Sequence, residues 1–476
     1  MSRDATLTAP ADTPATLATG RLERLFNPRS LVLVGASDSS AWSQLIHGNI
    51  VASGFAGPVY AVNRRGVPAH GRPGFTRCAD LPAPPDLAYL FVPAEGVAKA
   101  LADVAEAGIA HAIVLSSGFA ETGAEGAAAQ ARLAALARQK GIALLGPNSL
   151  GFNNYGARVA VSAFPVDGKA MAGGLSVISQ SGATAHVIAQ FARQQGIGLN
   201  CVVATGNEAG LGLVDVLDHF VGDPATRAIA LFAETIKDPA GFRQVAARAS
   251  AAGKPIVVVK VGKSELASRL AEAHTGAVTG DDAVFDAICR AHGVIRMDSL
   301  EAMVVAAGLM ADVGEITGEI GLLSISGGAC ELIADRAAGA GLRLAPFTPA
   351  TRARLEGVLS AYGAVFNPLD VTGAAVRDPS LFTQMLEILS ADPAMGFLGV
   401  VQDVPPAEGD TLNEPILAAI GAGLAAARVP GTLINQALQP IGPYSRAVLA
   451  RCAIPRAIGG VDHAVAALAA LQRWSE

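Results

Sequence analysis

The stretch Ser30-Leu31-Val32-Leu33-Val34, followed at once by Gly35-Ala36-Ser37-Asp38, decides the fold. A run of leucine and valine is typical of a strand buried on both faces, as in a parallel sheet. The small residues after it suit a tight turn into a helix, where free backbone N–H groups stabilise an anion. The turn lacks the full glycine pattern of dinucleotide-binding proteins. From these residues alone, a plain turn and a ligand site are equally open.

Apolar strands and alanine-rich helices then alternate along the chain. Strands are expected at 57–63, 87–93, 111–118 and 142–148, with helices near 94–107 and 124–140. The pattern restarts at 174–179, 198–204, 228–233 and 256–260, and again at 320–328, 397–401 and 431–434. Such alternation predicts an α/β protein with three doubly wound parallel-sheet domains, Rossmann-like and flavodoxin-like. The predicted divisions are a disordered segment over 1–20 and domains over 21–155, 156–312 and 313–476.

Composition limits the classes of partner. The 476 residues carry a net charge of −6, which gives no reason to expect nucleic acid binding. The five cysteines are scattered without a CxxC pair, which fits a reducing cytosol and argues against a structural zinc site. We see neither a signal-peptide pattern nor an apolar run of about 18 residues. We therefore expect a cytoplasmic protein without membrane contact, in which anionic ligands are held by local basic or N–H groups.

A second turn of small polar residues, Ser179-Gln180-Ser181-Gly182, lies directly between an expected strand and an expected helix. Two hydroxyls and a helix N-terminus suit a free phosphate, and ordinary N-capping by serine is an equal alternative. Ser324-Ile325-Ser326-Gly327-Gly328 repeats the pattern in the third domain. We interpret it as a decayed or partner-facing copy.

One histidine, His274, sits among small residues and glycine after the basic strand 254–260. Imidazole is a nucleophile that can carry a phosphoryl group without metal help, although a chance histidine in a surface loop is the simpler alternative. Glu234 ends the strand 231–233, where active sites of parallel sheets gather. Its carboxylate could orient a histidine, but from the residues alone a solvated loop charge is favoured.

Taken together, these segments resemble the NDP-forming acyl-CoA synthetases, in their α subunit or α-like half, over nearly the whole chain from about residue 21. The segments that carry the resemblance are Val34-Gly35-Ala36-Ser37, Ser117-Gly118-Phe119-Ala120-Glu121-Thr122-Gly123, Gly146-Pro147-Asn148-Ser149-Leu150-Gly151, Ser179-Gln180-Ser181-Gly182, Gly206-Asn207-Glu208, Ala273-His274-Thr275-Gly276-Ala277 and Asn367-Pro368-Leu369-Asp370. Each segment is short, but their order and spacing together are specific.

The resemblance implies roles for individual residues. His274 would be the phosphorylated residue, Glu234 would support it, and Ser179, Gln180, Ser181 and Gly182 would hold phosphate. Coenzyme A would lie against the first domain, at Gly35, Ala36, Ser37, Asn63, Arg64, Val92, Pro93, Ser117, Gly118 and Asn148. Acyl-CoA and phosphate would give acyl phosphate and coenzyme A. The phosphoryl group would then pass to His274 and on to ADP, and the synthetic direction is the reverse.

Two departures from the family pattern matter. Ser149 stands where the family often has cysteine, which would remove a thiol near the reacting centre. No segment is typical of an ATP-grasp domain, which the family uses to bind ATP or ADP with Mg²⁺. We therefore expect an ATP-grasp β-type partner subunit and a hetero-oligomer.

Two other classes of protein compete with this hypothesis. One is a regulatory protein that binds coenzyme A or acyl-CoA without ligase activity. Such a protein would not need His274, Glu234 and the Ser179–Gly182 turn together. The other is a nucleotide-dependent dehydrogenase built on the first domain, against which the incomplete glycine pattern and the two additional domains count.

Overall fold

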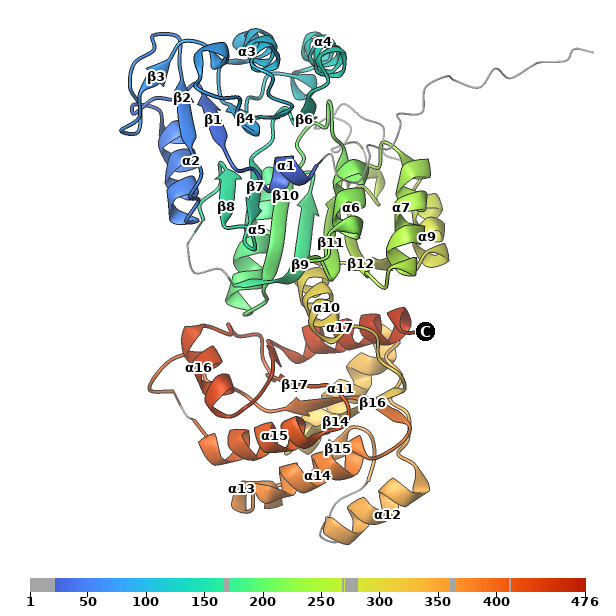
Figure 1. The fold of residues 1–476 in the computed structure, drawn as a ribbon. Coiled ribbons are helices and arrows are strands. Elements are labelled where there is room, and N and C mark those ends of the chain that lie inside the picture. Colours follow the sequence, from blue (N-terminus) through green and yellow to red (C-terminus); the bar gives the residue numbers. More distant parts are fainter. Residues whose placement is uncertain (1–21, 167–170, 268, 270–280, 360–364, 411) are drawn as a thin grey trace, which may run out of the picture.

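The computed structural model describes residues 22–476 except 167–170, 268, 270–280, 360–364 and 411. The predicted α/β class is confirmed, because three mostly parallel sheets flanked by helices follow one another along the chain (Figure 1). The predicted disordered segment at 1–20 lies outside the described residues.

The first sheet has the strand order β3-β2-β1-β4-β5-β6, and all its paired strands are parallel. This is the Rossmann order, in which the chain reverses direction across the sheet at β1. The strands are β1 Leu31–Val34, β2 Val59–Val62, β3 Gly74–Phe75, β4 Leu87–Leu90, β5 His111–Val114 and β6 Ala143–Leu145. The accompanying helices are α1 Glu23–Phe26, α2 Ala41–Ala52, α3 Ala94–Glu106 and α4 Ala124–Lys140.

The second sheet has the order β13-β12-β11-β9-β10-β7-β8. Its parallel part, with flavodoxin-like order, consists of β9 Ala172–Ser179, β10 Leu199–Ala204, β11 Ala228–Ala233, β12 Ile256–Lys260 and β13 Ile295–Arg296. Its helices are α5 Gly182–Gln194, α6 Leu213–Gly222, α7 Pro239–Ala251 and α9 Asp282–Ala291.

A hairpin that the sequence did not predict extends this second sheet. Strands β7 Gly151–Asn154 and β8 Val159–Ser162 pair antiparallel with each other, and β7 pairs antiparallel with β10. Asn153 and Asn154 make β7 look like a turn, and its strand conformation depends on the distant partner β10. The chain thus enters the second sheet at residue 151, shortly before the predicted division at 155.

The third sheet is parallel, with the flavodoxin-like order β15-β14-β16-β17-β18. Its strands are β14 Glu319–Ser324, β15 Leu369–Asp370, β16 Met395–Val401, β17 Gly431–Ile434 and β18 Ala457–Ile458. The helices around it are α11 Gly327–Ala340, α12 Pro349–Val358, α13 Ala374–Arg377, α14 Ser380–Ser390, α15 Glu414–Ala426 and α16 Pro443–Arg451.

Two helices, α10 Leu300–Val313 and α17 Val461–Trp474, lie between the second and third sheets (Figure 1). An unbroken run of α10 from Met303 to Ala311 is buried, as expected of a helix that is apolar all round. Both helices belong to one apolar core that also contains residues of β9 and β14. The second and third sheets are therefore held together by a shared core.

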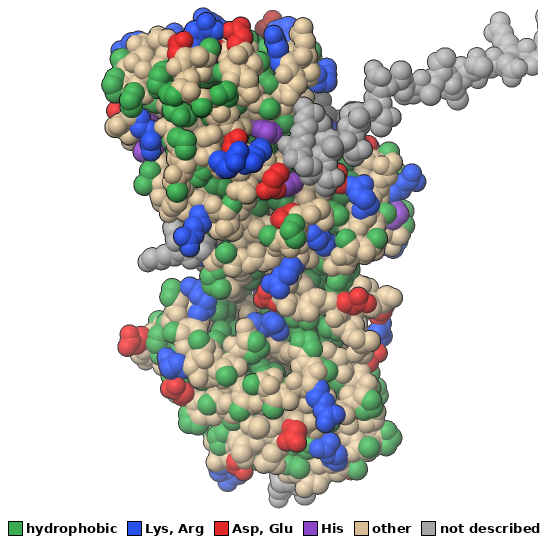
Figure 2. Space-filling model, in the orientation of Figure 1, with side chains coloured by type: hydrophobic (Ala, Val, Ile, Leu, Met, Phe, Trp, Pro, Cys, Tyr) green, Lys and Arg blue, Asp and Glu red, His purple; other side chains and the backbone are tan. Residues whose placement is uncertain are grey.

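The surface is mixed in charge, and Figure 2 shows Lys and Arg side chains interspersed with Asp and Glu over the visible face. All five cysteines are buried and free of disulfides. Within the described parts of the chain, no helix is both long and apolar enough to cross a bilayer.

A buried histidine in α6 predicts a pH dependence of stability. The His219 ring lies 5.1 Å from the Phe26 ring of α1, and burial lowers its pKa although Asp223 and Glu23 oppose the shift. A histidine with a depressed folded-state pKa stabilises the fold above its unfolded pKa of about 6.5, and this contribution is lost as the pH falls. We expect the free energy of unfolding in urea to fall below pH 6.5 by up to about 1.4 kcal/mol per pH unit from this group. His219→Gln should reduce that slope, and an unchanged slope would contradict the assignment.

Candidate active site

The predicted coenzyme-site residues lie along one edge of the first sheet. Each follows the carboxyl end of a parallel strand: Gly35, Ala36 and Ser37 after β1, Asn63 and Arg64 after β2, Val92 and Pro93 after β4, Ser117 and Gly118 after β5, and Asn148 after β6. These five strands are neighbours in the sheet. Ligands of doubly wound sheets bind at this edge, so the structure brings the predicted residues together where a ligand is expected.

The turn after β1 needs a glycine. Gly35 has φ +105°, and a Cβ there would lie 3.0 Å from the carbonyl oxygen of Phe91. An L side chain rarely adopts this backbone conformation, and the close approach of β4 leaves it little room. Ser40 caps the following helix α2 by accepting the Ser43 N–H at 3.3 Å. The turn therefore directs the capped N-terminus of a helix of 12 residues toward this edge.

A set of polar contacts that the sequence did not predict supports this turn. Asp38 Oδ1 accepts the His70 N–H at 2.7 Å and lies 3.1 Å from the same residue's Nδ1. His70 Nε2 lies 2.7 Å from Ser43 Oγ, which accepts the Ser37 N–H at 2.9 Å. His70 itself has φ +55°. The sequence did not indicate the contact between Asp38 and His70, because His70 lies 32 residues later in a loop without a recognisable pattern.

Asn63 shapes the turn beside the predicted anion contact. Its Nδ2 donates to the Val67 carbonyl at 2.8 Å, and its Oδ1 accepts the N–H groups of Arg65 and Val67 at 3.2 Å. The amide of Asn63 thus closes the loop that carries Arg64, whose side chain is exposed. Of Asn63 and Arg64, Arg64 is therefore the residue whose side chain is more available to an anionic ligand.

The structure gives Ser149 a different role from that of a missing thiol. The residue is fully buried, and its hydroxyl donates to the Ala204 carbonyl at 2.6 Å and accepts the Gly151 N–H at 3.0 Å. It links the end of β10 to the chain entering β7. Its neighbour Asn148 has φ +56° and donates from Nδ2 to Asn207 Oδ1 at 3.3 Å.

The turn after β9 has the serine cap that was the alternative to a phosphate site. Ser181 Oγ accepts the Thr184 N–H at 3.2 Å and caps α5, while Ser179 Oγ donates to the Ser181 carbonyl at 2.6 Å. A Cβ on Gly182 would lie 2.5 Å from Leu150 Cγ, so glycine lets this helix end pack against the first domain's last turn. N-capping is therefore observed, and phosphate binding by the same turn stays a prediction.

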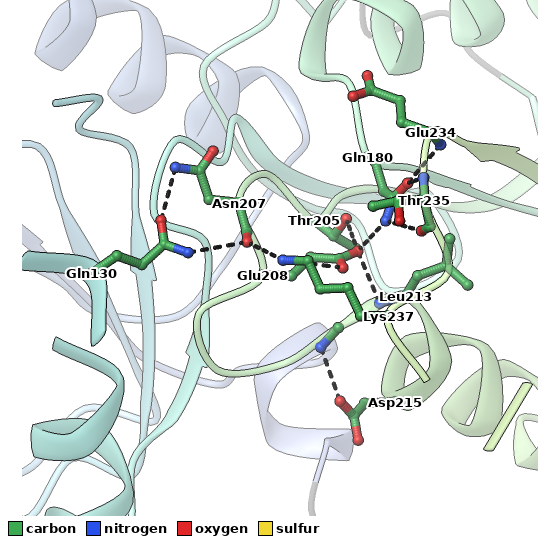
Figure 3. Close-up of polar contacts among 11 residues, drawn as sticks. Gln130, Gln180, Thr205, Asn207, Glu208, Leu213, Asp215, Glu234, Thr235 and Lys237 are labelled. Atoms are coloured by element: carbon green, nitrogen blue, oxygen red, sulfur yellow. Dashed lines mark hydrogen bonds and ion pairs between the residues drawn. The ribbon is translucent and has the colours of Figure 1, made fainter. Parts of the chain in front are cut away.

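The side chain of Gln180 is held by hydrogen bonds to other protein groups (Figure 3). Its Oε1 accepts the N–H groups of Glu234 and Thr235 at 2.6 and 2.9 Å. Its Nε2 donates to the Thr235 carbonyl at 2.8 Å and to Glu208 Oε1 at 3.0 Å. The side-chain amide is thus engaged on both sides, and we expect Gln180 to act on an anion through the position of its turn.

Glu234 follows β11, the strand next to β9, so it lies at the same sheet edge as the Ser179–Gly182 turn. Its side chain is half-buried, and Figure 3 shows the carboxylate directed away from the Gln180–Glu208 contacts. His274 lies outside the described residues, so the pairing of Glu234 with His274 stays a prediction.

Glu208 is a buried carboxylate to which the sequence analysis assigned no role. Its side chain is 2% exposed, and Oε1 accepts from Thr205 Oγ1 at 2.9 Å and from the Leu213 N–H at 3.0 Å, besides Gln180. Lys237 Nζ lies 3.8 Å from Oε2. Burial raises the pKa of the Glu208 carboxyl, and the opposing pull of Lys237 and the donors reduces that shift. The segment Gly206-Asn207-Glu208 at a strand end was the available signal.

The third domain repeats the turn as predicted. Ser326 Oγ accepts the Ala329 N–H at 3.3 Å and caps α11, and Ser324 Oγ accepts the Ser326 N–H at 3.1 Å. This is the arrangement of Ser179 and Ser181 in the second domain. Its interpretation as a decayed or partner-facing copy stays a prediction.

Removal of the α5 cap tests whether Ser181 contributes to phosphate binding as well as to stability. Ser181→Ala is expected to lower the free energy of unfolding by about 1 kcal/mol and to reduce phosphate incorporation into the protein strongly. Ser299→Ala is the matched control, because Ser299 caps α10 by accepting the Ala302 N–H at 3.1 Å. It should cost similar stability, measured by urea unfolding, and leave phosphate incorporation intact. Equal incorporation in the two variants would exclude Ser181 as a phosphate contact.

Comparisons with known proteins agree with this geometry. The model of a CoA binding domain matches residues 29–155, and that of a succinyl-CoA ligase like flavodoxin domain matches residues 172–310. The α subunit of ADP-forming acetate–CoA ligase I from Pyrococcus furiosus is 32% identical over 80% of this chain and 82% of its own length. A structure of the acetyl-coenzyme A synthetase 1 from Ca. Korarchaeum cryptofilum, in complex with phosphate and ADP, superposes with a TM-score of 0.84 at 27% identity, covering 95% of this chain and 97% of that one.

The fold and the two matched models define a protein with a CoA binding domain followed by a succinyl-CoA ligase like flavodoxin domain. The chain belongs to the NDP-forming acyl-CoA synthetase superfamily, in which it is similar to the α subunits of two ADP-forming acetate–CoA ligases of Pyrococcus furiosus. Other relatives are longer. The chain spans 56% of the trans-feruloyl-CoA synthase FCS1 of an unknown prokaryotic organism, at 33% identity over 82% of this chain, and 53% of the Archaeoglobus fulgidus ADP-forming acetate–CoA ligase I.

Proposed function

We propose that this chain is the α-type subunit of an ADP-forming acyl-CoA synthetase. In the thioester-consuming direction, phosphate attacks the acyl carbon, the C–S bond breaks, and acyl phosphate and coenzyme A are formed. The phosphoryl group then moves to a ring nitrogen of His274, which releases the carboxylic acid, and from there to the β-phosphate of ADP to make ATP. Synthesis of the thioester is the same sequence in reverse.

Within this proposal, residues 21–155 form the coenzyme A domain. The Gly35 turn, the N-terminus of α2 and the exposed Arg64 fit a ligand that carries several phosphate groups, because each supplies positive potential at the same sheet edge. Val92, Pro93, Ser117, Gly118 and Asn148 continue that edge along β4, β5 and β6.

Residues 156–312 form the phosphoryl-transfer domain in the same proposal, and residues 313–476 the second flavodoxin-like domain. Ser179, Ser181 and the α5 N-terminus would stabilise the negative charge of phosphate near the reacting oxygen. Glu234 would accept the second ring N–H of His274 and so fix the tautomer that leaves the other nitrogen nucleophilic.

An ATP-grasp β-type subunit would complete the enzyme, binding ADP or ATP with Mg²⁺, whose charge would offset that of the nucleotide phosphates when bound. The match to proteins named as α subunits supports a partner of this kind. We infer a soluble cytoplasmic hetero-oligomer whose other ligands are a carboxylic acid and its acyl-CoA.

The observation that carries the proposal is the alignment of this chain with an α subunit over about four fifths of both proteins, combined with the capped α5 turn beside Glu234. The test is co-expression with an ATP-grasp subunit, followed by assay of a panel of carboxylic acids for CoA thioester with ATP. ATP-dependent thioester formation is expected for at least one acid. Tight coenzyme A binding without thioester formation for any acid would favour the regulatory alternative.

A further inference from the structure

A chain of hydrogen bonds and one ion pair joins the two strand-end sites. At the first-domain end, Glu121 Oε1 accepts the N–H groups of Gly118 and Phe119 at 2.6 and 3.2 Å. The other oxygen, Oε2, accepts from Asn207 Nδ2 at 2.5 Å, and the same Nδ2 donates to Gln130 Oε1 at 3.0 Å. A residue of the second domain thus contacts the carboxylate that accepts the amides of the β5 turn.

The chain continues through the backbone and a lysine of the second domain (Figure 3). Lys237 Nζ donates to the Asn207 carbonyl at 2.7 Å and lies 3.8 Å from Glu208 Oε2. Glu208 in turn accepts from Gln180, which holds the N–H groups of Glu234 and Thr235. Two adjacent residues, Asn207 and Glu208, therefore contact opposite ends of the network.

Backbone packing makes this junction rigid. Gly206 has φ +64°, and a Cβ there would lie 2.5 Å from the Pro147 carbonyl oxygen and 2.6 Å from that of Asn148. The turn after β10 thus lies directly against the last turn of the first domain. Because a misplacement of the reacting groups by about 1 Å can cost roughly a hundredfold in rate, a closely packed junction between their sites has a direct use.

We propose that Asn207 and Glu208 are positioning residues, each of which orients the backbone of a different site. Asn207, acting through Glu121, sets the Gly118–Phe119 amides of the coenzyme A site. Glu208, acting through Gln180, sets the Glu234–Thr235 segment beside the phosphate turn. The inference rests on the proposed function, since it names what aligns the two substrates of that reaction.

The first test exchanges charge and amide at one end. Asn207→Asp places a carboxylate 2.5 Å from Glu121, and we expect the Kd of the full chain for coenzyme A, measured by calorimetry, to rise at least tenfold. Adding Glu121→Gln restores an N–H···O contact, while the carbonyl oxygen of the introduced side-chain amide can still accept the N–H groups of Gly118 and Phe119. The double variant should recover to within about threefold of wild type, which a merely destabilised protein would not do.

The second test disturbs the other end. Gln180→Glu keeps the acceptor for Glu234 and Thr235 but sets two carboxylates against each other at the 3.0 Å contact with Glu208. We expect the rate of acid-labile phosphate incorporation from acyl-CoA and phosphate to fall at least tenfold, with the Kd for coenzyme A within twofold of wild type. Asn207→Asp should instead raise the Kd for coenzyme A and leave the rate of phosphate incorporation at saturating acyl-CoA close to that of wild type.

Asp215→Asn is the matched control, since this nearby carboxylate accepts the Gly212 N–H at 2.9 Å at the start of α6. Both readouts should stay within twofold of wild type. Hydrogen exchange of the peptide that contains Gly118 and Phe119 gives a readout without catalysis, and it should quicken in Asn207→Asp and recover in the double variant. A wild-type chain that binds no coenzyme A would overturn the proposed function. Equal losses in both readouts, or unchanged exchange in Asn207→Asp, would overturn the positioning inference alone.

Discussion

His274→Ala is expected to abolish incorporation of acid-labile phosphate when the full chain is incubated with labelled phosphate and an acyl-CoA substrate. A histidine with an ordinary pKa of about 6.5 is largely neutral near pH 7, and the neutral ring has a nucleophilic nitrogen. Alanine removes the only protein atom that bonds to the migrating phosphoryl group in this proposal. The label should therefore fall to background and not merely decrease.

Two further variants make this prediction specific. Glu234→Gln should reduce the label strongly without removing it, because the amide can still contact the ring but cannot balance its charge. His292→Ala removes a histidine at the end of α9 in the same domain and should retain full labelling. Undiminished acid-labile label in His274→Ala would overturn the assignment, whatever the behaviour of the controls.

Most of the fold followed from the sequence because buried parallel strands have a local signature. The runs Ala228–Ala233 and Ile256–Lys260 were expected at the bounds observed, since each is short, mainly apolar and preceded by a turn that contains proline, Pro224 and Pro255. The β7–β8 hairpin was missed for the opposite reason. The polar end of β7 becomes a strand only through pairing with β10, which lies about fifty residues later in the chain.

The candidate sites divide in the same way. Positions at strand ends, such as Gly35 and Glu234, were predictable because parallel topology places all carboxyl ends at one edge. The contacts of Gln180 and Glu208 were not, because they depend on side-chain directions in three separate turns. Ser149 shows the limit of comparison by pattern. The family cysteine suggested a thiol lost from the reacting centre, whereas the burial of Ser149 and its two hydrogen bonds indicate a structural role.

Gly35→Ala is expected to weaken coenzyme A binding by the full chain at least tenfold, as measured by calorimetry. The new methyl group would meet the Phe91 carbonyl oxygen at 3.0 Å in a backbone region that costs an L residue about 1–2 kcal/mol. The turn must therefore shift, and with it the α2 N-terminus that would face the ligand phosphates. Gly54→Ala is the matched control, because it introduces the same backbone strain without a steric clash. Gly54 has φ +80° at the end of α2, with nothing within 4 Å of its Cβ position. It should lose similar stability and bind coenzyme A normally. Equal weakening in both variants would mean that instability, and not the Gly35 turn, controls binding, and the ligand would then have to be sought away from this edge of the sheet.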